Sequence, residues 1–146
     1  MITENEALIR IGVSLLLGGI IGIERYIHRH PAGVRTFMLI CLGSTLATLA
    51  SIWICQTNTH LINGDPGRIA AQVLTGVGFI GAGLIIKNNN DISGLTTATG
   101  IFVTAAVGVA VGVGMIRTAV VSTVAVVLIL FSSFLFHNSE KKNNQK

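Results

Sequence analysis

Charge is scarce in this sequence. Charged residues make up 11% of its 146 residues, against about 25% in ordinary soluble domains. They gather in short clusters, and no polar stripe follows the long uncharged runs between those clusters. A soluble helical bundle needs such a stripe along each helix, so the pattern excludes that class. It is typical of a membrane protein that crosses the bilayer several times.

Catalytic and redox patterns are also missing. The sequence contains no HExxH, CxxC, Walker A or Ser/His/Asp arrangement, so we expect neither enzyme activity nor a cofactor. The two cysteines, Cys41 and Cys55, fall on one expected helix about 21 Å apart along its axis. That separation excludes a disulfide between them, because disulfide-linked Cα atoms lie within about 7 Å.

Five apolar runs have roughly the length that a bilayer requires. They occupy residues 7–23, 34–55, 69–86, 95–114 and 118–136, and a helix needs about 20 residues to cross the hydrocarbon core. Residues 95–136 carry one charge, Arg117, and a single helix of that length would measure about 63 Å. We therefore predict an all-α membrane bundle of about five transmembrane helices in residues 1–136. Residues 137–146 are predicted to be a short disordered cytoplasmic tail.

The basic residues predict an orientation. With five helices the two termini lie on opposite sides of the membrane. One side then carries seven of the ten Lys and Arg: Arg25, Arg29, Arg35, Lys87, Lys141, Lys142 and Lys146. By the positive-inside rule this side is cytoplasmic, which places the N-terminus outside and the C-terminus inside. The net charge of +4 is thereby explained by topology and gives no reason to expect nucleic-acid binding.

Glu24 ends the first apolar run, where topology does not require an acid. An unpaired charge at the bilayer centre costs about 2.5–3.5 kcal/mol on insertion scales, and less near the edge. Arg35 opens the next helix after a tight turn, and His28 lies one helical turn beyond Glu24. We expect a Glu24–Arg35 pair that joins the first two helices, either as a structural contact or as part of a functional site. His28, Arg29 and His30 are otherwise explained as a basic turn at the lipid headgroups.

Small residues recur at helical spacing in the first and fourth expected helices. Gly18 and Gly22 form a GxxxG pattern whose face also holds Arg25, whereas Glu24 lies on another face. Such stripes let membrane helices approach closely, so we expect both to pack against neighbours. The fifth helix is nearly all large apolar residues over 124–131 and is expected to face lipid. The stripe of the fourth helix consists of Thr96, Gly100, Thr104, Gly108 and Gly112.

The third expected helix contains Gly76, Gly78, Gly81 and Gly83. The first three formally match GxGxxG, but a dinucleotide site needs a preceding strand and a βαβ unit, so we exclude it. Two interpretations stay open: the glycines let other helices approach, or they break the helix and expose carbonyls. Gln72 shares a face with Gly76, Phe79 and Gly83, and we expect its amide to be buried and bonded to another helix.

The connection at residues 87–99 is polar. Its asparagines, Asp91, Ser93, Thr96 and Thr97 offer the oxygen ligands that Mg²⁺ prefers. The favoured interpretation is an ordinary loop in which Ser93 or Thr96 caps the next helix. The sequence therefore assigns no metal site.

Four motifs, in order, resemble the membrane domain of MgtC/SapB proteins: GGIIGIER (18–25), PAGVRT (31–36), GVGFIGAG (76–83) and GLTTAT (94–99). The resemblance covers about residues 12–112. It implies a bacterial inner-membrane protein linked to magnesium homeostasis and, in some members, to virulence and survival inside host cells. The motif residues in this sequence are Glu24, Arg25, Arg35, Thr36, Gln72, Gly76, Gly78, Gly81, Gly83, Gly94, Thr96 and Thr97.

Two departures accompany the resemblance. Many family members continue into a soluble ACT-like domain, whereas this sequence ends at Lys146, so we expect regulation by that domain to be absent or supplied by another chain. Gly100-Ile101-Phe102 stand where the family commonly shows bulkier residues.

Two functions from different classes follow from these observations. We expect an accessory or regulatory membrane protein that contacts a second copy, as a homodimer, or another membrane complex. The alternative is a small magnesium or proton transporter or channel, whose path would be lined by Glu24, Arg25, Arg35 and Gln72.

Overall fold

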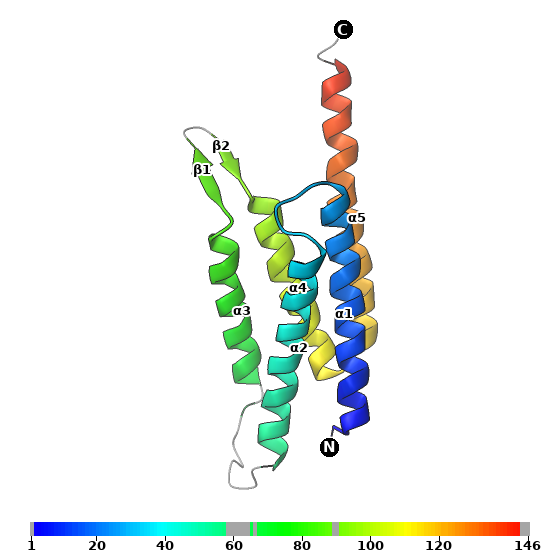
Figure 1. Cartoon of the computed structure of the whole chain (residues 1–146), viewed down its shortest axis with the longest axis vertical. Coiled ribbons are helices and arrows are strands. Elements are labelled where there is room, and N and C mark those ends of the chain that lie inside the picture. Colours follow the sequence, from blue (N-terminus) through cyan, green and yellow to red (C-terminus); the bar gives the residue numbers. More distant parts are fainter. Residues whose placement is uncertain (1, 58–64, 66, 89–90, 144–146) are drawn as a thin grey trace.

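The helices run alternately up and down, side by side, in the computed structural model of the chain (Figure 1). The structure describes residues 2–57, 65, 67–88 and 91–143, and the side chains among these up to residue 132. The amino end of α1 and the carboxyl end of α5 lie at opposite ends of the bundle, and the predicted all-α fold with five helices is confirmed. The elements are α1 (Glu4–Ile27), α2 (Val34–Thr57), α3 (Gly67–Ala82), β1 (Ile86–Asn88), β2 (Asp91–Ser93), α4 (Leu95–Val113) and α5 (Ile116–Asn143).

Three of the described helices, α1, α2 and α4, are long and apolar enough to cross a membrane. The apolar described part of α5, Ile116–Ser132, is shorter. α3 has 16 residues, about 24 Å of helix, because it ends at Ala82 and Ile86 already belongs to β1. The prediction that the third helix reaches residue 86 was therefore wrong. α5 continues to Asn143, and the short disordered cytoplasmic tail of residues 137–146 stays a prediction.

α4 lies at the centre of the bundle and contacts α1, α2, α3 and α5. Its small-residue stripe faces α2, as predicted, and all of the stripe except Thr96 is buried. A Cβ added at Gly108 would lie 2.8 Å from the Cβ of Ser44 and even closer to the carbonyl oxygen of Cys41. A Cβ added at Gly112 would lie 2.6 Å from the Cβ of Thr48. The α2 and α4 backbones can therefore approach this closely only because these positions are glycine.

α1 uses its GxxxG pattern in the same way on the other side of α2. A Cβ at Gly18 would lie 2.8 Å from the Cβ of Cys41, and one at Gly22 would lie 2.6 Å from the Cα of Val34. Cys41 consequently sits between Gly18 of α1 and Gly108 of α4. The predicted packing of both stripes is confirmed.

α3 is packed much more loosely. Only Val77 and Gly81 are buried among its residues, and Cβ atoms added at Gly76 or Gly78 would meet nothing within 4 Å in the described structure. The helix runs through Gly76, Gly78 and Gly81 without a break and ends at Ala82, one residue before Gly83, so these three glycines do not break it. Close packing holds for Gly81, where a Cβ would lie 3.5 Å from the carbonyl oxygen of Ala98. It does not hold for Gly76 and Gly78 within this chain, or for Gly83, whose neighbours within 4 Å belong to α3 itself.

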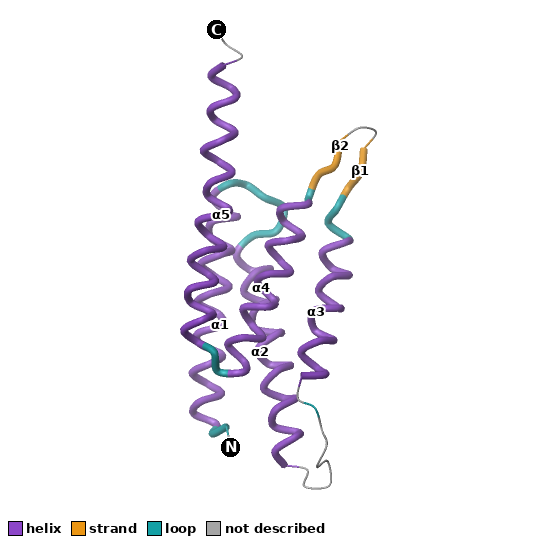
Figure 2. Tube along the Cα trace, turned by 180° about the vertical axis from the view of Figure 1, so that it is seen from behind, coloured by secondary structure: helices purple, strands orange, loops and turns teal. Residues whose placement is uncertain are grey.

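The 87–99 connection contains a short hairpin at the same end of the bundle as the α1–α2 connection (Figure 2). β1 and β2 pair antiparallel, with Ile86 opposite Ser93. Gly94, with φ of 87°, occupies the N-cap of α4 without a side-chain cap, so the predicted cap by Ser93 or Thr96 was wrong. The reason is steric: the chain turns back at Gly94 through a left-handed conformation that glycine adopts readily, and a Cβ there would strike the carbonyl of Leu84.

α5 packs against α1 and α4. Ala119, Thr123 and Leu130 are buried on that side, whereas Val124 and Leu128 are exposed. The exposed side of α5 agrees with the lipid-facing surface that was predicted for residues 124–131.

Candidate functional site

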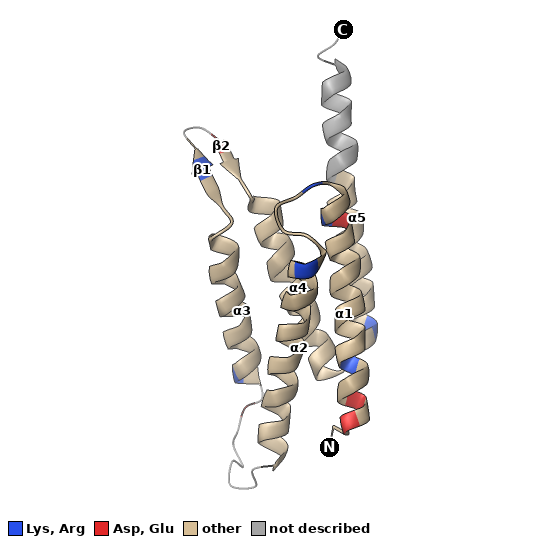
Figure 3. Cartoon of the chain, viewed as in Figure 1, with Lys and Arg blue, Asp and Glu red and all other residues tan. Residues whose placement is uncertain are grey.

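Acidic and basic residues of the described chain lie toward both ends of the bundle (Figure 3). The buried ones lie at the end where α1 meets the α1–α2 connection. Glu24 is 6% exposed and Arg25 is 2% exposed, although both are on a helix with the length and hydropathy of a membrane span. Ionised residues buried in such helices are expensive, and they are candidates for function by default.

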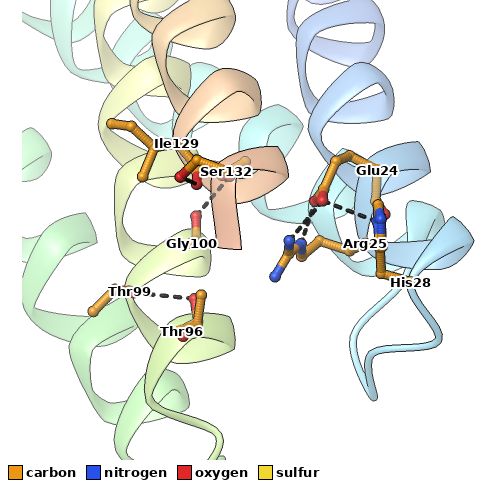
Figure 4. A network of polar contacts seen from close by, with 9 residues as sticks. Glu24, Arg25, His28, Thr96, Thr99, Gly100, Ile129 and Ser132 are labelled. Atoms are coloured by element: carbon orange, nitrogen blue, oxygen red, sulfur yellow. Dashed lines mark hydrogen bonds and ion pairs between the residues drawn. The ribbon is translucent and has the colours of Figure 1, made fainter. Parts of the chain in front are cut away.

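Glu24 is held by two neighbours on its own helix (Figure 4). The Arg25 guanidinium binds the carboxylate with two donors: Nε donates to Oε2, and Nη2 donates to Oε1 over 2.7 Å. Nδ1 of His28 lies 3.0 Å from Oε1 and 2.9 Å from the backbone carbonyl oxygen of Glu24. A two-pronged Arg–carboxylate contact of this kind is strong and geometrically specific. We define Glu24, Arg25 and His28 as the α1 charge cluster.

The predicted Glu24–Arg35 pair was wrong. Arg35 is exposed in the first turn of α2, and the ion pairs of Glu24 in the described structure are with Arg25 and His28. The long Arg25 side chain can fold sideways onto the preceding residue, and His28 shares the face of Glu24 at the i,i+4 spacing. The partners were therefore available locally, before α2 begins.

The turn after the cluster is also partly buried. Arg29 adopts a left-handed conformation with φ of 54°, which reverses the chain after α1. Burial, and secondarily the positive charge of Arg25, lower the pKa of His30 below its usual value. Arg29 in the same turn is exposed.

The other candidate residues do not assemble into one site. Gln72 is exposed on α3, so its amide is not buried against another helix of this chain. Thr96 is exposed at the start of α4, Thr97 is buried in its first turn, and Thr36 is half-buried on α2. Of the four residues expected to line an ion path, two are buried in a mutual ion pair and two, Arg35 and Gln72, are exposed. In the described chain they form no single path.

A row of buried hydroxyls was missed by the sequence analysis. The hydroxyl of Thr45 donates to the carbonyl of Gly108 on α4 over 2.8 Å, whereas those of Ser44 and Thr48 donate to carbonyls one turn back on α2. Because hydrogen bonds satisfy these hydroxyls, burial does not leave their polar atoms unpaired. The signal was present in the sequence as polar residues at helical spacing in α2: Ser44, Thr45, Thr48 and Ser51.

Arg10 was also missed, having been counted only in the charge asymmetry. Its Nη1 donates to the carbonyl of Gly112 over 2.7 Å, and its Nη2 would lie 2.9 Å from a Cβ added at Gly114. A cation at the carboxyl end of α4 complements the helix dipole and its unpaired carbonyls. The contact ties the first turns of α1 to the last turn of α4. Among the described residues, no group of three or more His, Cys, Asp or Glu could hold a metal ion.

Comparisons with known proteins agree with the motif resemblance. The profile of the MgtC family matches residues 11–139. A protein of Escherichia coli K12 named "Putative magnesium transporter YhiD" is 44% identical over 127 residues, which cover 86% of this chain and 59% of the relative. "Protein SapB" of Bacillus subtilis is 37% identical over 128 residues, covering 86% and 55%. "Protein MgtC" of Brucella abortus is 40% identical over 118 residues, covering 80% and 46%.

The matches also define what is shared. The chain spans about half the length of these curated relatives, and no solved structure matches it significantly. The matched residues, 11–139, run from within α1 into α5 and contain the α1 charge cluster. With three helices of membrane-spanning length and composition and a family profile over most of its residues, this chain belongs to the MgtC family of membrane proteins.

Proposed function

We propose that this chain is an accessory or regulatory protein of magnesium homeostasis that acts by helix–helix contact within the bacterial inner membrane. The link to magnesium is supported by the similarity to the Escherichia coli protein named "Putative magnesium transporter YhiD". The orientation follows the positive-inside rule: the end that carries the α1 charge cluster and the β1–β2 hairpin faces the cytoplasm, and the N-terminus faces outside.

The observation that carries the proposal is the uncovered outer face of α3, which we define by Gln72, Gly76 and Phe79 of the helix and Gly83 directly after it. All four residues are exposed, and Phe79 is 83% exposed, the largest value among the large apolar side chains that the structure describes. The stripes of α1 and α4 show that this chain uses glycine where helices touch. The same residue type on α3, beside an aromatic side chain and an amide, is suited to a helix from a second copy or from another membrane complex.

The α1 charge cluster fits a structural role in this proposal. Its carboxylate is neutralised by Arg25 and bonded to His28, so the cluster stiffens the end of α1 beside α2. The hydroxyls of the core are bonded to backbone carbonyls and do not form a chain of hydrated groups. These contacts support a packed bundle rather than a conducting path through one protomer.

Photo-cross-linking in native membranes tests the proposal. A photoreactive p-benzoyl-phenylalanine at residue 79 is expected to give a discrete adduct, whose mass distinguishes a second copy from another protein. The matched control is residue 16, where Leu16 is 69% exposed on α1 and should give no discrete adduct. Equal labelling at both residues, or none at residue 79, would contradict the proposed contact.

One observation favours the second candidate, a small magnesium or proton transporter or channel. Glu24 is a buried acid on a membrane-length helix, and such acids commonly mark ion pathways. For an ion to pass, the Glu24 carboxylate would have to release the Arg25 guanidinium and bind the ion in its place. Ion flux into liposomes separates this candidate, which requires flux, from the accessory role, which does not.

A further inference from the structure

The cytoplasm-facing end of the proposed orientation has a hollow at its surface, beside the first turn of α2. It has a volume of about 370 Å³ and is lined by Tyr26, Gly33, Val34, Arg35 and Thr36. Arg35 and Tyr26 are both exposed there, so the hollow offers a guanidinium and a phenol hydroxyl beside the hydroxyl of Thr36. Tyrosine is typical of the membrane–water boundary, where its ring meets acyl chains and its hydroxyl meets headgroups.

A second hollow begins at the same threonine. It is a groove of about 550 Å³ between α2 and α3, and its lining includes Thr36, Leu39, Gly43, Val73 and Ile80. Along α2 the groove extends from Thr36 to Ser44, about 12 Å of helix. Its walls are almost entirely apolar, and no side chain fills it at Gly43 or Gly76, where an added Cβ would meet nothing within 4 Å among the described residues. Something must occupy such a groove in a bilayer, because protein interiors and their contacts are close-packed.

We propose that the two hollows form one binding site for an anionic phospholipid, with the phosphate headgroup at Arg35 and Thr36 and an acyl chain in the α2–α3 groove. Thr36 lines both hollows, so the polar hollow at Arg35 is continuous with the apolar groove. A phospholipid has the same arrangement, with a polar headgroup joined to apolar acyl chains. A transmembrane helix of another protein would fill the apolar groove but would leave the cationic hollow unmatched.

The charges at this end select an anionic headgroup. Among the side chains that the structure describes at this end, Arg29, Arg35 and Lys87 are exposed, against one exposed acid, Asp91. Glu24 is buried and bound by Arg25. Basic residues beside a membrane attract anionic lipids, and each contributes about 1 kcal/mol near the surface. This site shares Gly76 with the outer face of α3, but its headgroup contacts lie on α2, and it does not require Phe79 or a protein partner.

Native mass spectrometry of the purified full chain, with added lipid, tests the site. We expect phosphatidylglycerol to be retained as a defined adduct and phosphatidylcholine to be retained less. Arg35→Gln should reduce the retained phosphatidylglycerol about fivefold, the effect of one basic residue at an anionic surface, and Arg35→Lys should restore most of it. Gly43→Leu, which fills the groove, should abolish retention. The matched controls are Arg117→Gln, at an exposed arginine of α5, and Gly12→Leu, at an exposed α1 glycine that also has open space around it.

Each alternative outcome overturns the proposal. Equal retention of both lipids would show that Arg35 and Thr36 do not select a headgroup. If inorganic phosphate, added in place of lipid, were retained as strongly as phosphatidylglycerol, the groove would not bind an acyl chain. A dimer that dissociates on Gly43→Leu, without lipid retention in the wild type, would assign the groove to a second copy. Equal losses with the control substitutions would show a general effect on lipid contact. Circular dichroism of every variant verifies that the helices are retained, so a loss of lipid is not a loss of fold.

Discussion

Replacing Gly108 by Leu is expected to destabilise the folded bundle by about 3 kcal/mol or more, at the upper end of the cost of overpacking a core. The new side chain would begin with a Cβ in contact with the carbonyl oxygen of Cys41 and 2.8 Å from the Cβ of Ser44. A backbone carbonyl cannot rotate away as a side chain can. α2 also cannot simply withdraw, because Gly18 of α1 presses on Cys41 from the other side.

Equilibrium unfolding in mixed micelles, with a rising fraction of dodecyl sulfate and helix content followed by circular dichroism, measures this effect. Gly12→Leu is the control, since Gly12 is exposed on α1 and a Cβ there meets nothing within 4 Å in the described structure. It should leave the midpoint nearly unchanged. If Gly108→Leu unfolds at the same detergent fraction as Gly12→Leu, α2 and α4 do not touch as described here.

Arg25→Leu is expected to cost about 3–5 kcal/mol, the usual effect of removing one member of a buried ion pair. The substitution leaves the Glu24 carboxylate 6% exposed with His28 as its remaining ion-pair partner in the described structure. Arg29→Leu is the matched control, because it removes the same side chain at an exposed position four residues later. It should leave the unfolding midpoint unchanged.

The double substitution Glu24→Leu/Arg25→Leu identifies the cause. Removing both charges leaves no buried ion without a partner, so it should recover most of the stability that either single substitution loses. The same micelle titration on the wild type, both single variants and the double variant gives the coupling free energy. Additive losses would mean that the two side chains contribute independently, and the α1 charge cluster would then not be a mutual ion pair.

The sequence predicted the contacts of α1 and α4 because helical period alone determines which small residues share a face. Gly18 and Gly22 fall on one face of any helix, and so do Gly100, Thr104 and Gly108. A face of small residues lets another membrane helix approach closely, so the sequence predicted that these two faces are buried against neighbours. The five helices were predictable for a similar reason, since apolar length sets how many crossings a chain can make.

The same reasoning failed for α3 because spacing does not reveal whether a neighbour is present. Gly76 and Gly81 are five residues apart and lie on different faces of α3. A Cβ at Gly81 would lie near Ala98 of α4, whereas one at Gly76 would meet nothing within 4 Å in the described structure. Which glycines are covered depends on where α2 and α4 lie, and that is a property of the whole bundle. The partner of Glu24 was missed for a related reason: the direction of the first turn of α2, and thus of Arg35, is set by the connection.

Magnesium flux is the most direct test of the claim that this chain acts by contact rather than by transport. The purified chain is reconstituted into liposomes that enclose a magnesium indicator, and a magnesium gradient is applied with and without a membrane potential. A parallel set with a pH indicator reports protons. We predict no flux above that of empty liposomes for the wild type or for Glu24→Gln. If the wild type shows a flux that Glu24→Gln abolishes, and the variant keeps its helix content, the chain transports ions. The α1 charge cluster would then be part of an ion path.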